Sequence, residues 1–374
     1  MKVMLNGFLR QFLAWAASGS LWLACSSADG AAGQEALALD SARNTGRLRL
    51  ELNNDLFFAD DSQFSNGFSL QYHGVCYNTW AGSQAPALVK WVGEHFPSLG
   101  DGETVVRYGQ GIGQNLVTPA DIQAEMPPAG DIPYAATLTY SLGWQSFNDQ
   151  KASVFQATAG ILGEEALGEQ VQKFVHNDLG AGDDPKGWET QRDTEPVLNF
   201  SYEHLRCLGR LGEADDGWAG RLEVGQAVHV GNLLTGAEVG GALRLGWNMP
   251  EGFAATPAPP GRGLFKALHL PKPASASPHG WEVVLGARVS GLLYSVFYDG
   301  SLITDDDRDV EREDFIFSAG VGLNYYHYDR FAIRILFLAN SDVIDEDSIP
   351  DPGPGVEKTE PSTSYGSIVM EFPF

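Results

Sequence analysis

Three things are scarce in this 374-residue sequence, and each scarcity narrows what the protein can be. Lys and Arg number 24 against 48 Asp and Glu, and the net charge of −24 argues against nucleic acid as a partner. No stretch after the N-terminus reaches the ~18 apolar residues that a membrane-spanning helix needs. Cysteine is rare: beyond the N-terminal segment only Cys76 and Cys207 remain, which allow one disulfide and require none.

The N-terminus has the pattern of an export signal. Lys2 and Arg10 precede an apolar run that ends at Ala24, and small residues follow it. Cleavage beyond this run predicts a signal peptide over residues 1–33 and an exported domain over residues 34–374.

From Arg47 onward the sequence consists of short segments in which polar and apolar residues alternate, separated by turns. In one segment Leu243, Leu245 and Trp247 alternate with Arg244 and other polar or small residues, as expected for lipid outside and a polar lumen inside. The chain also ends on a phenylalanine in such a segment, which resembles the assembly signal of outer-membrane barrels. The expected strands are 47–58, 64–75, 104–117, 134–147, 151–161, 191–206, 217–230, 234–248, 279–298, 313–328, 330–340 and 363–374.

We therefore predict an all-β fold, a transmembrane antiparallel β-barrel of about 12 strands in the outer membrane. A soluble β-sandwich or barrel of the same size is the alternative. If the first strand starts in the periplasm, the connection 162–190 is an outer loop, and the long connections 76–103 and 249–278 are periplasmic insertions. Within the first insertion, residues 84–96 are expected to form a short amphipathic helix.

The outer loop 162–190 holds the clearest helical period in the chain. Gln172 and His176 lie one turn apart on its polar face, and an acidic turn follows. A loop helix with a solvated polar face explains the same pattern. The opposite face is apolar at i, i+4, i+7 and i+8: Leu167, Val171, Phe174 and Val175.

Two further polar clusters are expected at the same outer rim. Asn54 and Asp55 lie towards the end of the first strand, and Ser65 opens the second. A histidine acting as general base and a carboxylate that holds a metal ion or orients the histidine suit ester hydrolysis. Taken singly, Ser65 also fits a strand-end hydrogen bond, and Asp55 also fits a turn cap.

Five motifs, in this order, resemble the outer-membrane lipid A 3′-O-deacylases over nearly the whole mature chain. They are Asn54-Asp55-Leu56-Phe57-Phe58, Phe64-Ser65-Asn66-Gly67, Gly130-Asp131 with Pro133-Tyr134-Ala135, Gly168-Glu169-Gln170-Val171-Gln172 with His176, and Gly187-Trp188 with Gln191.

The resemblance implies a twelve-stranded, calcium-dependent enzyme that removes the 3′-linked acyloxyacyl group from lipid A of lipopolysaccharide. We expect the protein to be a monomer. It implies a site facing the outer leaflet and surrounded by outer-membrane lipids. His176 would activate water, and Gln172, Asn54 and Ser65 would complete the polar catalytic set. Asp55 and an acidic residue beyond the helix, Asp183 or its neighbour Asp184, would bind the calcium ion.

Two other functions stay open. In the first, Ser65 is the nucleophile of an outer-membrane lipase or phospholipase, and His176 accepts its proton. In the second, the barrel is not catalytic and acts as a porin or adhesin. For the metal, calcium is favoured because it prefers hard oxygen ligands, and no Cys or second His accompanies His176 at a zinc-like spacing.

Overall fold

The fold is described here from a computed structural model over residues 43–54, 64–178, 184–212, 217–254, 267–273, 276–306, 308–350, 359 and 361–374, with the backbone alone described at 64–66 and 177–178. All of them belong to one compact unit, Ala36–Phe374. The expected signal peptide lies outside the described residues. No helix in the described part of the chain is long and apolar enough to cross a membrane.

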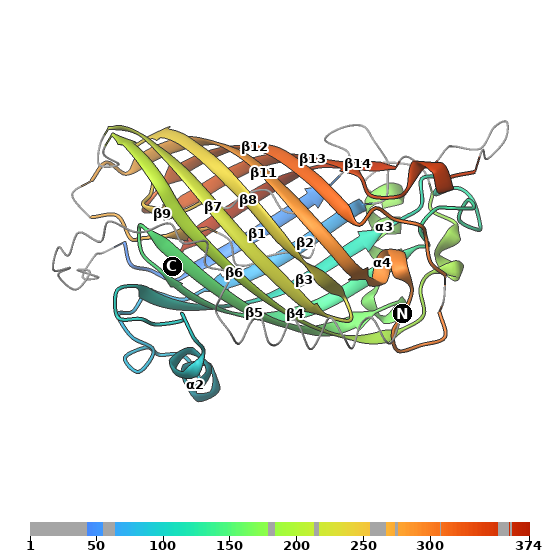
Figure 1. Cartoon of the computed structure of the whole chain (residues 1–374), viewed down its shortest axis with the longest axis horizontal. Coiled ribbons are helices and arrows are strands. Elements are labelled where there is room, and N and C mark those ends of the chain that lie inside the picture. The colour runs from blue at the N-terminus through green and yellow to red at the C-terminus, as the bar shows by residue number, and fades with distance from the viewer. Residues whose placement is uncertain are drawn as a thin grey trace. The chain divides into compact units, whose positions relative to one another are not determined.

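Twelve of the described strands form one closed antiparallel barrel in which sequence neighbours pair and β1 meets β14 (Figure 1). The prediction of twelve barrel strands is confirmed. The strands are β1 Arg47–Asn54, β2 Phe64–His73, β3 Val105–Val117, β4 Ala135–Phe147, β5 Lys151–Leu162, β6 Glu195–Gly212, β7 Trp218–Gly231, β8 Leu234–Trp247, β11 His279–Ser295, β12 Phe315–His327, β13 Phe331–Asp342 and β14 Ser362–Pro373.

The barrel wall follows the expected alternation between its two faces. On β8, Leu243 and Leu245 are exposed, whereas Arg244 between them is fully buried. Because successive side chains of a strand point to opposite faces, the exposed series faces outwards and the buried polar series faces the lumen. The outward residues of β8 are those that the sequence predicted to face lipid.

The described parts of the insertion after β8 pack inside the barrel. They contribute the short hairpin of β9 (Gly252–Phe253) and β10 (Leu268–His269). Inward arginines hold it: Arg244 donates to the carbonyl of Pro250, and Arg107 donates to that of Ala267 at 3.1 Å. The inward side chains at this end are therefore buried, unlike those of an open pore.

The insertion after β2 packs on the opposite, outward face of the wall. Its helix α2 (Ala87–His95) confirms the helix expected over residues 84–96. The Trp144 indole donates a hydrogen bond of 2.8 Å to the carbonyl of Val89, which fixes the helix to β4. Cys76 and Cys207 are both free thiols, so neither insertion is closed by a disulfide between them.

The outer end of the barrel carries the remaining short helices, and α3 and α4 lie together at the end opposite to α2 (Figure 1). These helices are η2 Glu164–Ala166, α3 Gly168–Lys173, η3 Phe174–Asp178, η4 Gly187–Thr190, α4 Val296–Asp299 and η5 Glu346–Ser348.

Candidate active site

The helix of the outer loop changes from α-helical to π-helical geometry along its length. One α-helical turn and a half, α3, continues directly into the π-helical turn η3, which contains His176. Short π-helical segments are rare and occur frequently at functional sites. His176 follows Gln172 by four residues, so the two lie about one turn apart, as the sequence predicted.

The face by which this helix packs differs from the one that its apolar period indicates. Leu167 and Phe174 are about half exposed, whereas Gln172 is only 3% exposed. The alternative of a solvated polar face is wrong for Gln172. The physical reason is close approach: the helix meets the wall through Gly168, and a Cβ there would lie 2.5 Å from the Cβ of Ala136 on β4.

Trp188 fixes the orientation of the buried amide. Its indole N–H donates a hydrogen bond of 2.7 Å to Oε1 of Gln172. The indole in turn packs against Gly168 on one side and the Tyr134 ring, 4.9 Å away, on the other. With its oxygen engaged, Gln172 keeps a buried Nε2 that has no hydrogen-bond partner. A buried donor without a partner costs roughly 1–3 kcal/mol, so this Nε2 is a candidate to bind a substrate oxygen or a water molecule.

The wall beneath the helix is the outward face of the barrel. Ala136 shares its side of β4 with the exposed Tyr140, and Asn54 shares its side of β1 with the exposed Leu52. Both therefore face outwards. The register also places them in one row across four strands, since the following residues pair in turn: Ala136 with Leu116, Leu116 with Asn66, and Asn66 with Asn54.

The length of this row gives the distance that the helix would have to span. Three strand spacings separate Asn54 from Ala136, which is ~14 Å at 4.8 Å per strand. The helix over residues 168–178 is ~16 Å long and can cover that span. The structure thus places Asn54 at one end of this row and the start of the helix at the other, and the convergence of Asn54, Gln172 and His176 stays a prediction.

Ser65 lies at an irregularity in this wall. The pairing of β2 with β3 shifts between Phe64 and Asn66, so Ser65 is the extra residue of a β-bulge. Bulges are over-represented next to active sites. Asp55 and Asp183 lie outside the described residues, and Asp184 is described and exposed.

The described donor set fits a calcium site only in part. No group of three His, Cys, Asp or Glu among the described residues is arranged to hold a metal ion. Gln172 offers a nitrogen rather than an oxygen, because Trp188 engages its Oε1. Asn54 can supply an amide oxygen, so the remaining ligands would be Asp55 and Asp183. The calcium prediction stays a prediction.

Two buried carboxylates brace the loops around the site. Burial raises the pKa of Asp131, although the backbone N–H groups of Ala120 and Ile132 donate to it. Burial would also raise the pKa of Asp306, but hydrogen bonds from Arg308 and from the backbone N–H of Asp193, with the charge of Arg192, lower it. Because the pKa of Asp306 is lowered, its ionised carboxylate stabilises the loops at neutral pH through these hydrogen bonds. This stabilisation is lost as the pH falls through the lowered pKa.

The contact at Gly168 gives a test of helix placement. Gly168→Val would put side-chain atoms into Ala136 and the Trp188 ring, so the helix must move away from the wall. If the site catalyses the ester hydrolysis that the sequence predicts, we expect its rate to fall by about 100-fold or more, because ~1 Å of misplacement can cost that much. The barrel should still assemble, as measured by its heat-resistant migration in gels. Gly209→Ala is the matched control, since a Cβ there meets nothing within 4 Å; equal activity of the two variants would contradict this placement.

Sequence reasoning gave no role to two residues that shape the site. One is Trp188, noted only as part of a motif. The other is Gln114, whose side chain donates a hydrogen bond of 2.6 Å to the carbonyl of Ala166, just before α3. An outward-facing Gln in a lipid-facing strand was the available signal, because such a polar group needs a partner.

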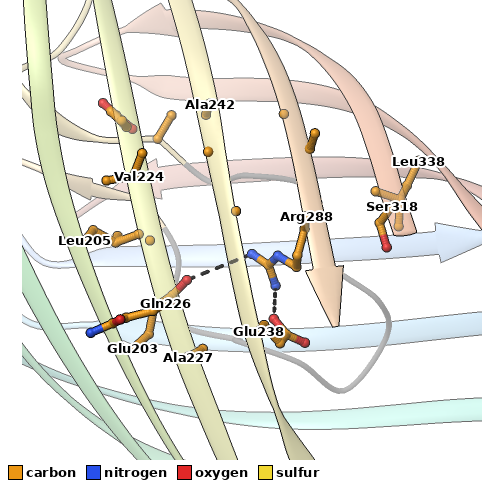
Figure 2. Close-up of a pocket in the computed structure, with 17 residues that line it drawn as sticks. Glu203, Leu205, Val224, Gln226, Ala227, Glu238, Ala242, Arg288, Ser318 and Leu338 are labelled. Atoms are coloured by element: carbon orange, nitrogen blue, oxygen red, sulfur yellow. Dashed lines mark hydrogen bonds and ion pairs between the residues drawn. The ribbon is translucent and has the colours of Figure 1, made fainter. Parts of the chain in front are cut away.

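A separate pocket lies in the barrel lumen between β6, β7, β8 and β11 (Figure 2). Glu238, which lines it, shares the inward face of β8 with Arg244. The one cation of its lining, Arg288, is paired with both Glu203 and Glu238. Its cation is thus already paired, and the pocket lies on the side of the wall away from the lipid, so we do not assign the site to it.

Comparisons with known proteins agree with the fold and identify the family. The family model described as outer membrane protein LpxR matches residues 17–351. The solved structure of LpxR from Salmonella typhimurium matches with a TM-score of 0.66 and 15% identity, covering 88% of this chain and 100% of that one. The β domain of the Bordetella autotransporter BrkA reaches a TM-score of only 0.36 at 6% identity, with 88% and 98% of the two chains covered. No curated protein matches the chain. The chain therefore belongs to the LpxR family of outer membrane proteins.

Proposed function

We propose that this protein hydrolyses the 3′-linked acyloxyacyl ester of lipid A in the outer leaflet of the outer membrane. The observation that carries the proposal is the buried Gln172 amide, held by Trp188 with its Nε2 unpaired, on the outward face of the wall. A membrane lipid can reach polar groups on the outward face of the barrel without entering the lumen. Family membership and the motif resemblance support the same reaction.

Each residue has a separate role in the proposed ester hydrolysis. His176 takes a proton from water, and the water oxygen attacks the ester carbonyl carbon. Nε2 of Gln172 donates to the carbonyl oxygen as negative charge develops there, and the Asn54 amide holds the water. The bond from the acyl carbon to the sugar oxygen then breaks, and protonated His176 returns its proton to that oxygen. The products are a free acyloxyacyl acid and a lipid A hydroxyl group.

Calcium, when bound by Asp55, Asp183 and the Asn54 oxygen, would polarise the ester carbonyl and stabilise its negative charge. Outer loops rich in carboxylates suit such an ion, because calcium accepts several oxygen ligands in irregular geometry.

The test is an assay of the purified barrel in detergent micelles with lipid A as substrate. Release of the acyloxyacyl acid, with glycerophospholipid in matched micelles left intact, is the expected result. Release of fatty acid from phospholipid, with lipid A left intact, would instead support the phospholipase alternative.

That alternative has one observation in its favour, the position of Ser65 at the β-bulge beside the same row of residues. If Ser65 attacks the ester, its Oγ forms a bond to the acyl carbon, His176 accepts the hydroxyl proton and passes it to the alcohol oxygen, and the bond from the acyl carbon to that oxygen breaks. An acyl-enzyme then accumulates when its hydrolysis by water is slow. Mass spectrometry of the intact protein after brief reaction decides between the schemes. An added acyl mass on Ser65 supports the serine scheme, and its absence during turnover supports water.

The Trp188 hydrogen bond gives a prediction of its own. Trp188→Phe keeps a ring against Gly168 but frees the Gln172 amide to rotate. We expect kcat to fall about fivefold, in line with a hydrogen bond worth ~1 kcal/mol, while KM changes little. Trp218→Phe is the control, since that indole is exposed on β7. A rise in KM with unchanged kcat would show that Trp188 shapes substrate binding and does not orient the amide.

A further inference from the structure

We infer that α2 is an interfacial membrane anchor whose exposed flank inserts into the phospholipid leaflet on the periplasmic side of the outer membrane. This inference is independent of the proposed reaction. Its first support is position: α2 lies on the outward face of the wall. Trp144, which donates to Val89, shares its side of β4 with the exposed Tyr140.

The helix runs around the barrel rather than along it. Its first turn is fixed to Trp144 on β4. Phe96, just past its last turn, stacks on Phe155 of β5 at 4.6 Å and contacts Tyr202 of β6 at 5.9 Å. A helix that crosses three neighbouring strands lies roughly in the plane of the bilayer, which is the orientation of interfacial helices.

The buried stripe of α2 is narrow. Val89 and Gly93 are buried, and a Cβ on Gly93 would lie 2.4 Å from the Trp80 ring. At 100° per residue, Leu88 and Glu94 fall on opposite flanks of this stripe. Leu88 and His95 share one flank, and Lys90 and Glu94 share the other. Trp91 lies opposite the stripe, and its ring stacks on His95 of the Leu88 flank. The helix therefore has a wall-facing stripe, an apolar aromatic flank and a charged flank.

The apolar flank has no protein to cover it in the described part of the chain. Leu88 is 66% exposed and Trp91 is 58% exposed. Trp91 stacks on His95 with ring centroids 5.0 Å apart, which leaves an aromatic pair at the surface. Tryptophan and histidine rings with polar edges prefer the headgroup region, and leucine prefers the acyl region just inside it.

The apolar flank of α2 adjoins the lipid-facing surface of the barrel wall, and we therefore infer that lipid covers this flank. Phe155, on which Phe96 stacks, also stacks with Phe200 at 6.3 Å, and Phe200 is 41% exposed on the outward face of β6. The surface next to α2 is thus the same surface that contacts acyl chains along the barrel. An apolar flank continuous with that belt extends it into the interface.

The test places a fluorophore on each flank in full-length protein in phospholipid nanodiscs. Leu88→Cys and Glu94→Cys are labelled in a background that carries Cys25→Ser and Cys207→Ser, because the remaining Cys76 is buried. Nanodiscs then carry phospholipid with a nitroxide at the headgroup or at the upper acyl chain. We expect quenching at position 88 to exceed that at position 94 several-fold, with either nitroxide.

Two results would overturn the inference. Equal and weak quenching at both positions would show that α2 stands clear of the bilayer. Weak quenching at position 88 together with a blue-shifted label would show that protein, not lipid, covers the flank. Circular dichroism of each labelled variant confirms that the barrel is assembled before the comparison is made.

Discussion

His176→Ala is expected to reduce lipid A deacylation by roughly 10²- to 10⁴-fold, the loss typical of a missing general acid–base group. The barrel should assemble normally, because His176 lies in η3 of an outer loop and not in a wall strand. The assay measures the initial rate of acyloxyacyl acid release at a fixed concentration of folded protein.

The comparison needs a variant that alters a histidine outside the site. His95→Ala serves, since His95 is exposed at the end of α2 on the opposite end of the barrel (Figure 1). Its rate should match that of the unmodified protein. Activity of His176→Ala within a few-fold of that rate would show that the helix is only a lid over the site.

Removal of calcium is expected to abolish hydrolysis reversibly. Excess chelator should stop turnover, and added calcium should restore it better than magnesium, which gives up its water reluctantly. Asp55→Asn should lower the rate and raise the calcium concentration needed for half-maximal activity, because a charged ligand is lost. The measurement is a calcium titration of the initial rate.

Asp347→Asn is the matched control for the charge change, since Asp347 is an exposed carboxylate of the outer helix η5. It should leave the calcium titration unchanged. Undiminished turnover in excess chelator would remove the metal from the mechanism and favour Ser65 as nucleophile.

The barrel was predictable because its pattern is local. Leu243, Arg244 and Leu245 report directly on which side of the wall each side chain faces, since one face meets lipid and the other a polar lumen. The sequence did not predict on which face of the barrel wall each of the two insertions packs. Residues 249–278 are rich in proline and have no period, so nothing in them indicates that Arg244 and Arg107 bind the carbonyls of Pro250 and Ala267 inside the barrel.

The helix of the site shows a second limit. An apolar period identifies the buried face of a helix only when water surrounds the protein. Here Leu167 and Phe174 are exposed, which carries little penalty beside lipid, and the polar Gln172 is buried. Its burial depends on Trp188, 16 residues further along the chain, whose indole satisfies the amide oxygen. Such a tertiary contact leaves no periodic trace in the sequence.

The most direct test of the central claim is mass spectrometry of lipid A from cells that carry this protein in their outer membrane, compared with cells carrying His176→Ala at equal levels. We predict a lipid A species that has lost the 3′-linked acyloxyacyl group in the first case and intact lipid A in the second. Intact lipid A in both, with the barrel assembled and calcium supplied, would contradict the proposed reaction.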